Sequence, residues 1–112
     1  MNLQELTAAL ELTALTPGTS PAGELSGGYV SDLLSDVLAN APADGVLVTV
    51  QVHLNVVAVA VHAGLKAVIF ALDRRPEEAV VQRAVQEGIA LFCSALPAFE
   101  IVGRLYQHGL RG

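Results

Sequence analysis

The sequence contains no tryptophan, a single cysteine and only six basic residues. The lone cysteine, Cys93, excludes an internal disulfide and a metal cluster held by several thiolates. The lysine and arginine residues begin at Lys66 and form no cluster, so the stripe of positive charge that follows a nucleic-acid backbone is missing. We therefore expect neither DNA nor RNA as a partner. A discrete anion could still bind backbone N–H groups at a helix N-terminus.

Long apolar runs are missing as well. The longest one, residues 56–61, lies between Asn55 and His62 and is far shorter than the roughly 20 residues of a membrane span. The N-terminus carries Glu5 and Glu11 and does not have the basic-then-apolar pattern of a signal peptide. These absences predict a cytoplasmic protein without membrane contact.

What the sequence does contain is a large share of small and medium apolar residues. Apolar residues make up 53% of the 112 positions, and the formal net charge is −5. This composition is typical of tight layers of helix on sheet, and it argues against disorder, which needs low hydrophobicity and high net charge. The length suits one core, so residues 1–112 are expected to form a single domain.

Helical and strand patterns alternate along the chain. Helical spacing of apolar residues predicts helices over 3–10, 33–41, 56–62, 75–88 and 97–108. Short apolar or alternating segments predict strands over 12–15, 46–52, 66–72 and 89–93. Ser31 or Asp32, Asn55 and Ser94 are expected to cap helices, Pro76 to open one, and Gly64 to end one. The alternation predicts an α/β fold, a three-layer domain whose mainly parallel sheet is covered by helices.

The first candidate site is the glycine pair Gly27 and Gly28, which runs into Ser31 and Asp32. Two glycines before a helix permit close backbone approach, and an anion could then reach the N–H groups of the helix. The spacing matches neither a dinucleotide-binding motif nor a phosphate-binding loop, which also needs a lysine. A tight turn between strand and helix explains the pair equally well.

The second candidate site is a row of polar residues: Thr49, Gln51, His53 and Asn55. In a strand the first three point to one face, because side chains alternate with a period of two. The carboxyl end of a strand is where open α/β sheets usually bind ligands. The alternative is that these side chains face solvent or satisfy neighbouring loops.

Catalytic patterns are weak. Asp32 and Asp36 lie one helical turn apart and could bind a cation or act as acid and base, although a solvated helix face is the simpler reading. Cys93 lies in an apolar strand and is expected to be a core residue. No catalytic triad, nucleophile elbow or metalloprotease motif is present. We therefore expect neither an enzyme nor a bound metal or cofactor.

The run from Glu24 to Ala41, followed by that from Val48 to Ala60, resembles the DRTGG domain family, and the similarity extends to 98–101. The resemblance implies an α/β module similar to the N-terminal domain of HPr kinase/phosphorylase. Such modules also accompany phosphotransacetylase domains and occur between CBS domains in some pyrophosphatases. Some small relatives are labelled serine kinases. Here only the glycine pair of the name-giving motif is present, because Glu24-Leu25-Ser26 precedes it.

The resemblance implies regulation, ligand sensing or dimer formation. The leading hypothesis is a homodimeric regulatory module that binds a small anionic or nucleotide-like ligand. Its site would comprise the residues of both candidate regions: Gly27, Gly28, Ser31, Asp32, Thr49, Gln51, His53 and Asn55. The alternatives are a subunit that docks a separately encoded enzyme through its acidic surface and C-terminal helix, and a small phosphotransfer enzyme that uses His53 with Asp32 or Asp36.

Overall fold

Five strands form one sheet in the computed structural model, which describes every residue from Met1 to Gly112. The strands are β1 (Thr13–Ala14), β2 (Gly28–Val30), β3 (Val46–Thr49), β4 (Ala67–Phe70) and β5 (Ala90–Cys93). Their order across the sheet is β1-β5-β4-β3-β2. Strands β2 to β5 are parallel, whereas β1 pairs antiparallel with β5. The carboxyl ends of four strands therefore meet at the same edge of the sheet, which we call the carboxyl edge.

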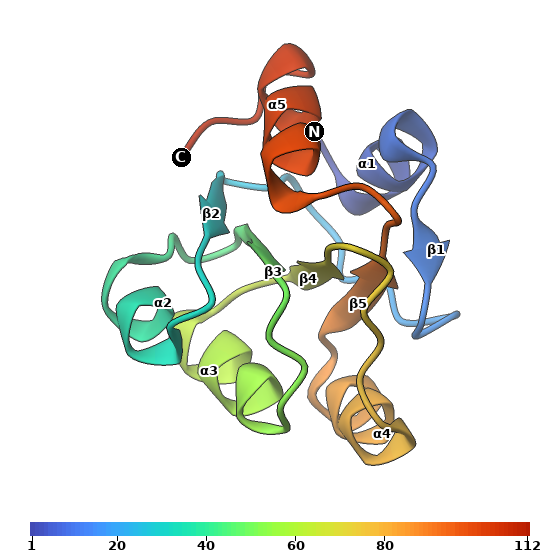
Figure 1. Cartoon of the computed structure of the whole chain (residues 1–112), viewed down its shortest axis with the longest axis vertical. Coiled ribbons are helices and arrows are strands. Elements are labelled where there is room, and N and C mark those ends of the chain that lie inside the picture. Colours follow the sequence, from blue (N-terminus) through green and yellow to red (C-terminus); the bar gives the residue numbers. More distant parts are fainter.

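Helices cover both faces of the sheet (Figure 1). One face carries α1 (Leu3–Leu10) and α5 (Ala98–Gln107). The other face carries α2 (Leu34–Asn40), α3 (Asn55–Ala63) and α4 (Glu78–Glu87). The predicted three-layer α/β fold with a mainly parallel sheet is confirmed. None of the helices is long and apolar enough to cross a bilayer.

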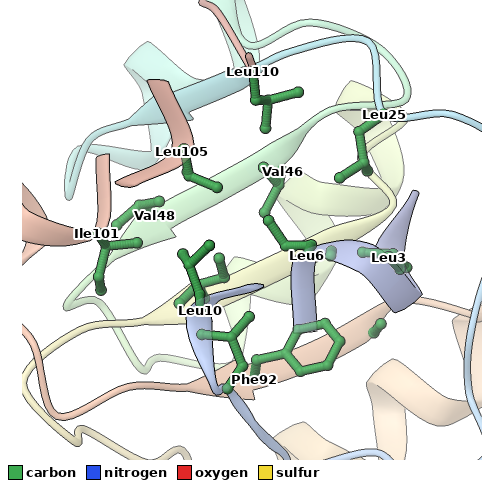
Figure 2. Packing of buried hydrophobic residues seen from close by; sticks show 14 of the residues in the cluster. Leu3, Leu6, Leu10, Leu25, Val46, Val48, Phe92, Ile101, Leu105 and Leu110 are labelled. Atoms are coloured by element: carbon green, nitrogen blue, oxygen red, sulfur yellow. The ribbon is translucent and has the colours of Figure 1, made fainter. Parts of the chain in front are cut away.

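The core is divided by the sheet into two apolar layers. Val46 and Val48 of β3 lie in the layer under α1 and α5, whereas Leu47 lies in the layer under α2, α3 and α4. Figure 2 shows the first layer, in which Leu6 of α1 and Ile101 of α5 pack onto the strands. The alternation follows from the period of two along a strand, and it makes β3 a central strand buried on both faces.

Several predicted boundaries and caps are wrong. The strand expected over 46–52 ends at Thr49, because the following backbone N–H groups bind side chains instead of a neighbouring strand. Asn55 is not a cap but the first residue of α3. Ser31 and Pro76 precede their helices without capping or opening them, since α2 begins at Leu34 and α4 at Glu78. Ser94 likewise lies before the N-cap position of α5.

Other expectations agree with the structure. Gly64 and Gly88 end α3 and α4 in the left-handed conformation, with φ of 73° and 72°, which glycine adopts without the steric cost of a Cβ atom. Helix α3 is apolar on nearly every side. It buries Val56, Val57 and Ala60 against the sheet but leaves its outer face exposed.

Candidate ligand-binding site

The carboxyl ends of β2 and β3 are joined by Asp32. One carboxylate oxygen, Oδ1, accepts hydrogen bonds from the hydroxyl of Thr49 and from the backbone N–H of Val50, both at 2.8 Å. Thr49 is fully buried, whereas Asp32 is exposed. Asp32 is therefore fixed in place by two donors through one oxygen, and its second oxygen remains free to accept a hydrogen bond from a ligand.

The polar residues after β3 form a relay with the backbone. Thr49 Oγ1 accepts from the N–H of Gln51 at 3.0 Å, Gln51 Oε1 from the N–H of His53 at 3.1 Å, and His53 Nδ1 from the N–H of Asn55 at 3.1 Å. Each side chain thus satisfies the backbone two residues ahead, as in Asx-type turns. Thr49, Gln51 and His53 are two residues apart, as in a strand, but their side chains form hydrogen-bonded turns and do not line one face of a strand.

The relay leaves side-chain donors without a partner. Gln51 uses its carbonyl oxygen and keeps both amide hydrogens, while His53 accepts at Nδ1 and so carries its hydrogen at Nε2 in the neutral ring. The side chain of Asn55 makes no hydrogen bond, and His53 and Asn55 are both exposed. The N–H of Asn55, at the start of α3, already donates to His53 Nδ1. An anion bound to this N–H would therefore have to displace the His53 side chain.

The loop after β4 adds a strained segment to the same edge. Leu72 and Asp73 both have left-handed backbones, with φ of 57° and 54°, which is uncommon for residues other than glycine. Their N–H groups donate to Leu96 O at 2.9 Å and Ser94 O at 2.7 Å in the loop after β5. These bonds hold the conformation, which leaves the Leu72 side chain 56% exposed at the carboxyl edge.

Two cations follow that segment. Arg74 and Arg75 are both exposed, and Arg75 forms a surface ion pair with Asp73 at 3.3 Å. Arg74 has no ion-pair partner. They are the one pair of adjacent basic residues in the chain, and they lie at the carboxyl end of a central strand. The two adjacent arginines are visible in the sequence. Their position beside the candidate site became clear only from the structure, because it follows from the end of β4 at Phe70.

Gly27 and Gly28 do not belong to this site. They lie at the beginning of β2, where Gly28 pairs with Val46, and thus at the opposite end of the strand from Asp32. A Cβ atom on Gly27 would come within 2.7 Å of the backbone oxygen of Arg111, so this glycine allows the C-terminal tail to pack closely. The expectation that the pair precedes a helix is therefore wrong, because it opens a strand and fits a backbone contact.

Asp36 has a different partner from Asp32. It accepts hydrogen bonds from the hydroxyl of Tyr29 at 2.7 Å and the amide of Asn40 at 2.8 Å. These donors, Tyr29 first, hold the pKa of Asp36 below its ordinary value, and the same bond raises the pKa of Tyr29. Asp36 therefore ties α2 to β2, and it shares no hydrogen-bond partner with Asp32.

The remaining reactive residues are also occupied or buried. Cys93 is 1% exposed, and burial raises the pKa of its thiol. Ser94 Oγ accepts from the N–H of Leu96 at 3.2 Å and shapes the loop after β5. No group of three or more His, Cys, Asp or Glu side chains has the arrangement of a metal site.

The sequence matches no family model and no curated protein. The structure is similar to a crystal structure of the CBS and DRTGG domains of the regulatory region of Clostridium perfringens pyrophosphatase, complexed with its activator, diadenosine tetraphosphate. The TM-score is 0.73 at 11% sequence identity. The two share a fold. The match covers 95% of this chain and 46% of that chain, so this chain spans less than half of its neighbour.

Proposed function

We propose that this chain is a non-catalytic regulatory module that binds a small nucleotide-like anion at its carboxyl edge. The observation that carries the proposal is the arrangement of Asp32, which two donors from β3 and its following loop fix through a single carboxylate oxygen. A carboxylate that is oriented in this way at the end of a parallel strand is suited to accept hydrogen bonds from ribose hydroxyls. The second carboxylate oxygen of Asp32 would accept a hydrogen bond from a ribose hydroxyl and so favour ligands that contain ribose.

The groups beside Asp32 complete the proposed contacts. The amide hydrogens of the half-buried Gln51 and the Nε2 hydrogen of the exposed His53 are unused donors, and Arg74 supplies a positive charge that no carboxylate pairs. Charge-assisted hydrogen bonds from arginine to phosphate are among the stronger polar contacts in proteins. We assign the ribose to Asp32 and the phosphates to the donors after β3 and β4.

Two further points support a regulatory role. The structural neighbour is the regulatory region of an enzyme and binds a nucleotide activator, and the sequence resembles the DRTGG family, for which regulation and dimer formation are the implied roles. His53 makes no hydrogen bond with Asp32 or Asp36, so the pair that a phosphotransfer reaction would need is not assembled. We therefore propose that the module acts as a homodimer on a catalytic partner and has no catalytic activity itself.

A second candidate function is docking onto a separately encoded enzyme without a small ligand. The observation in its favour is Phe99 at the start of α5, which is 88% exposed. Leu72 and Leu54 are exposed at the carboxyl ends of β4 and β3. Apolar side chains in such a position are typical of protein contacts. On this reading, Phe99→Ala would abolish capture of the enzyme, and nucleotides would have no effect.

Calorimetric titration with diadenosine tetraphosphate and with ATP tests the first proposal. Binding is expected for the wild type and is expected to weaken in the variants Asp32→Asn and Gln51→Ala. Gln82→Ala is a matched control, because Gln82 is an exposed glutamine on α4, away from the site. Absence of heat with both nucleotides, or an equal loss of affinity in Gln82→Ala, would overturn the assignment.

A further inference from the structure

A chain of hydrogen bonds connects Asp32 to Arg74. The hydroxyl of Thr49 donates to Asp32, and the backbone oxygen of Thr49 accepts from the N–H of Ala71 at 3.0 Å. The backbone oxygen of Ala71 then accepts from the N–H of Arg74 at 3.1 Å, which closes a tight turn after β4. Although Asp32 and Arg74 follow different strands, the backbone of both is therefore held at the carboxyl edge through β3.

The loop after β5 stabilises this turn. Leu72 and Asp73 are its central residues, and both have the left-handed backbone, which persists only where surrounding contacts determine it. The N–H of Leu72 donates to the backbone oxygen of Leu96, and the N–H of Asp73 donates to that of Ser94. The turn leads from β4 to α4, whereas the loop with the two acceptors leads from β5 to α5 (Figure 1). The backbone that precedes Arg74 thus depends on a second loop.

The side chain of Ser94 fixes that second loop. Its Oγ accepts from the N–H of Leu96 at 3.2 Å, as in turns closed by a serine hydroxyl. Pro97 follows directly, with φ of −68°, and its ring restricts the backbone of Leu96 from the other side. Ser94 and Leu96 are both half-buried, so their hydrogen bond is partly shielded from water. The Leu96 oxygen is therefore held where it meets the N–H of Leu72.

The turn also separates the charges around Arg74. Asp73 forms an ion pair with Arg75 at 3.3 Å, so these two exposed side chains offset each other. Arg74 lies between them in the sequence and has no ion-pair partner. Its guanidinium is thus the charge that remains for a charge-assisted hydrogen bond to phosphate. A relaxed turn would free Asp73 to pair with Arg74 instead.

We propose that Ser94 is a positioning residue for the phosphate contact of Arg74. The inference rests on the proposed function and extends it to a loop that has no ligand contact assigned. The Ser94 hydroxyl fixes Leu96, Leu96 holds the left-handed turn at Leu72, and the turn directs Arg74 to the phosphates. Ser94 therefore acts on the phosphates and not on the ribose, and it contributes to the selection of nucleotides over nucleosides.

Calorimetric titration of Ser94→Ala with ATP and with adenosine tests this role. The affinity for ATP is expected to fall about threefold, half in free energy of the roughly tenfold loss expected for Arg74→Gln. The affinity for adenosine should not change, because adenosine carries no phosphate. Added salt should weaken ATP binding less in Ser94→Ala than in the wild type. Ser94→Thr retains the hydroxyl and should keep the wild-type affinity for ATP.

Asn2→Ala is the matched control. Asn2 Oδ1 also accepts from a backbone N–H, that of Glu5 at 2.9 Å, but it does so at the start of α1. The variant should lose stability through the missing helix cap without losing affinity for ATP. An equal loss of ATP affinity in Asn2→Ala would show that Ser94→Ala acts through stability alone, and it would overturn the positioning role.

A double variant and amide hydrogen exchange test the intermediate steps. In the Arg74→Gln background, Ser94→Ala should have no further effect on ATP affinity, and the amide of Leu72 should exchange faster in Ser94→Ala than in the wild type. Unchanged exchange at Leu72, unchanged ATP affinity in Ser94→Ala, or an equal loss in both backgrounds would overturn the positioning role and leave the nucleotide site in place. Absence of ATP binding by the wild type would refute the proposed function and the positioning role together.

Discussion

Replacement of Thr49 by valine tests the coupling between β3 and the candidate site. Valine has nearly the same shape as threonine, so the buried position stays filled while the hydroxyl is lost. Thr49 is fully buried and uses its hydroxyl twice, as a donor to Asp32 and as an acceptor from the N–H of Gln51. The variant therefore removes the fixed orientation of Asp32 and the first step of the relay in one substitution.

The magnitude follows from the two lost hydrogen bonds. A bond to a charged group contributes about 1.5–3 kcal/mol, and an unsatisfied buried N–H costs about 1–3 kcal/mol. Asp32 is exposed and Gln51 is half-buried, so water recovers part of both terms. We expect Thr49→Val to lower the free energy of unfolding by about 2 kcal/mol, and the melting temperature by about 8 °C for a domain of this size. Urea unfolding and calorimetry measure these values.

Thr16→Val is the matched control. Thr16 is 3% exposed, and its hydroxyl accepts from the N–H of Leu91 in β5, on the far side of the sheet from Asp32. It should lose similar stability, yet only Thr49→Val should weaken nucleotide binding. Unchanged stability in Thr49→Val, or an equal loss of binding in Thr16→Val, would refute the reasoning.

Three further predictions concern other parts of the chain. Gly27→Ala should destabilise, because its Cβ would lie 2.7 Å from a backbone oxygen of the C-terminal tail, whereas Gly103→Ala should stabilise α5 by roughly 0.5–1 kcal/mol in urea unfolding. The pKa of Asp36 is lower in the folded protein than in the unfolded chain, so its ionised form stabilises the fold above the unfolded pKa. This stabilisation is lost as the pH falls and the carboxylate is protonated. The difference in urea midpoint between the wild type and Tyr29→Phe should therefore shrink below about pH 4. Cys93 should react with a thiol reagent at the rate of unfolding, and immediate reaction of the folded protein would contradict its burial.

The fold was predictable because the spacing of apolar residues distinguishes helical from strand segments along the chain. The alternation of helical and strand segments gave the parallel sheet and its two helical layers, and Gly64 was identified as a helix end from its place after an apolar run. The end of β3 was not predictable in the same way. Residues 46–52 continue to alternate, but after Thr49 the alternation serves hydrogen bonds from side chain to backbone. A period of two is common to both arrangements.

The candidate site was predictable in part. Asp32 and Thr49 lie together, as the combined candidate site predicted, although Asp32 follows strand β2, which was not predicted, and does not cap a helix. The glycine pair was assigned to the same site because it was expected to lie directly before a helix, whereas β2 separates it from Asp32 by the length of the strand. The left-handed backbone of Leu72 could not be predicted, because a leucine residue does not indicate a positive φ. The hydrogen bonds that stabilise this segment are accepted by residues 94 and 96, which lie far away in the sequence.

The most direct test of the account is backbone NMR of the labelled protein titrated with diadenosine tetraphosphate. Saturable shifts are expected, centred on the amides of Asp32, Val50, Gln51 and His53 and extending to Arg74, and they should weaken in Thr49→Val. Absence of saturable shifts, or shifts centred on another surface such as the exposed side of α1 and α4, would contradict it.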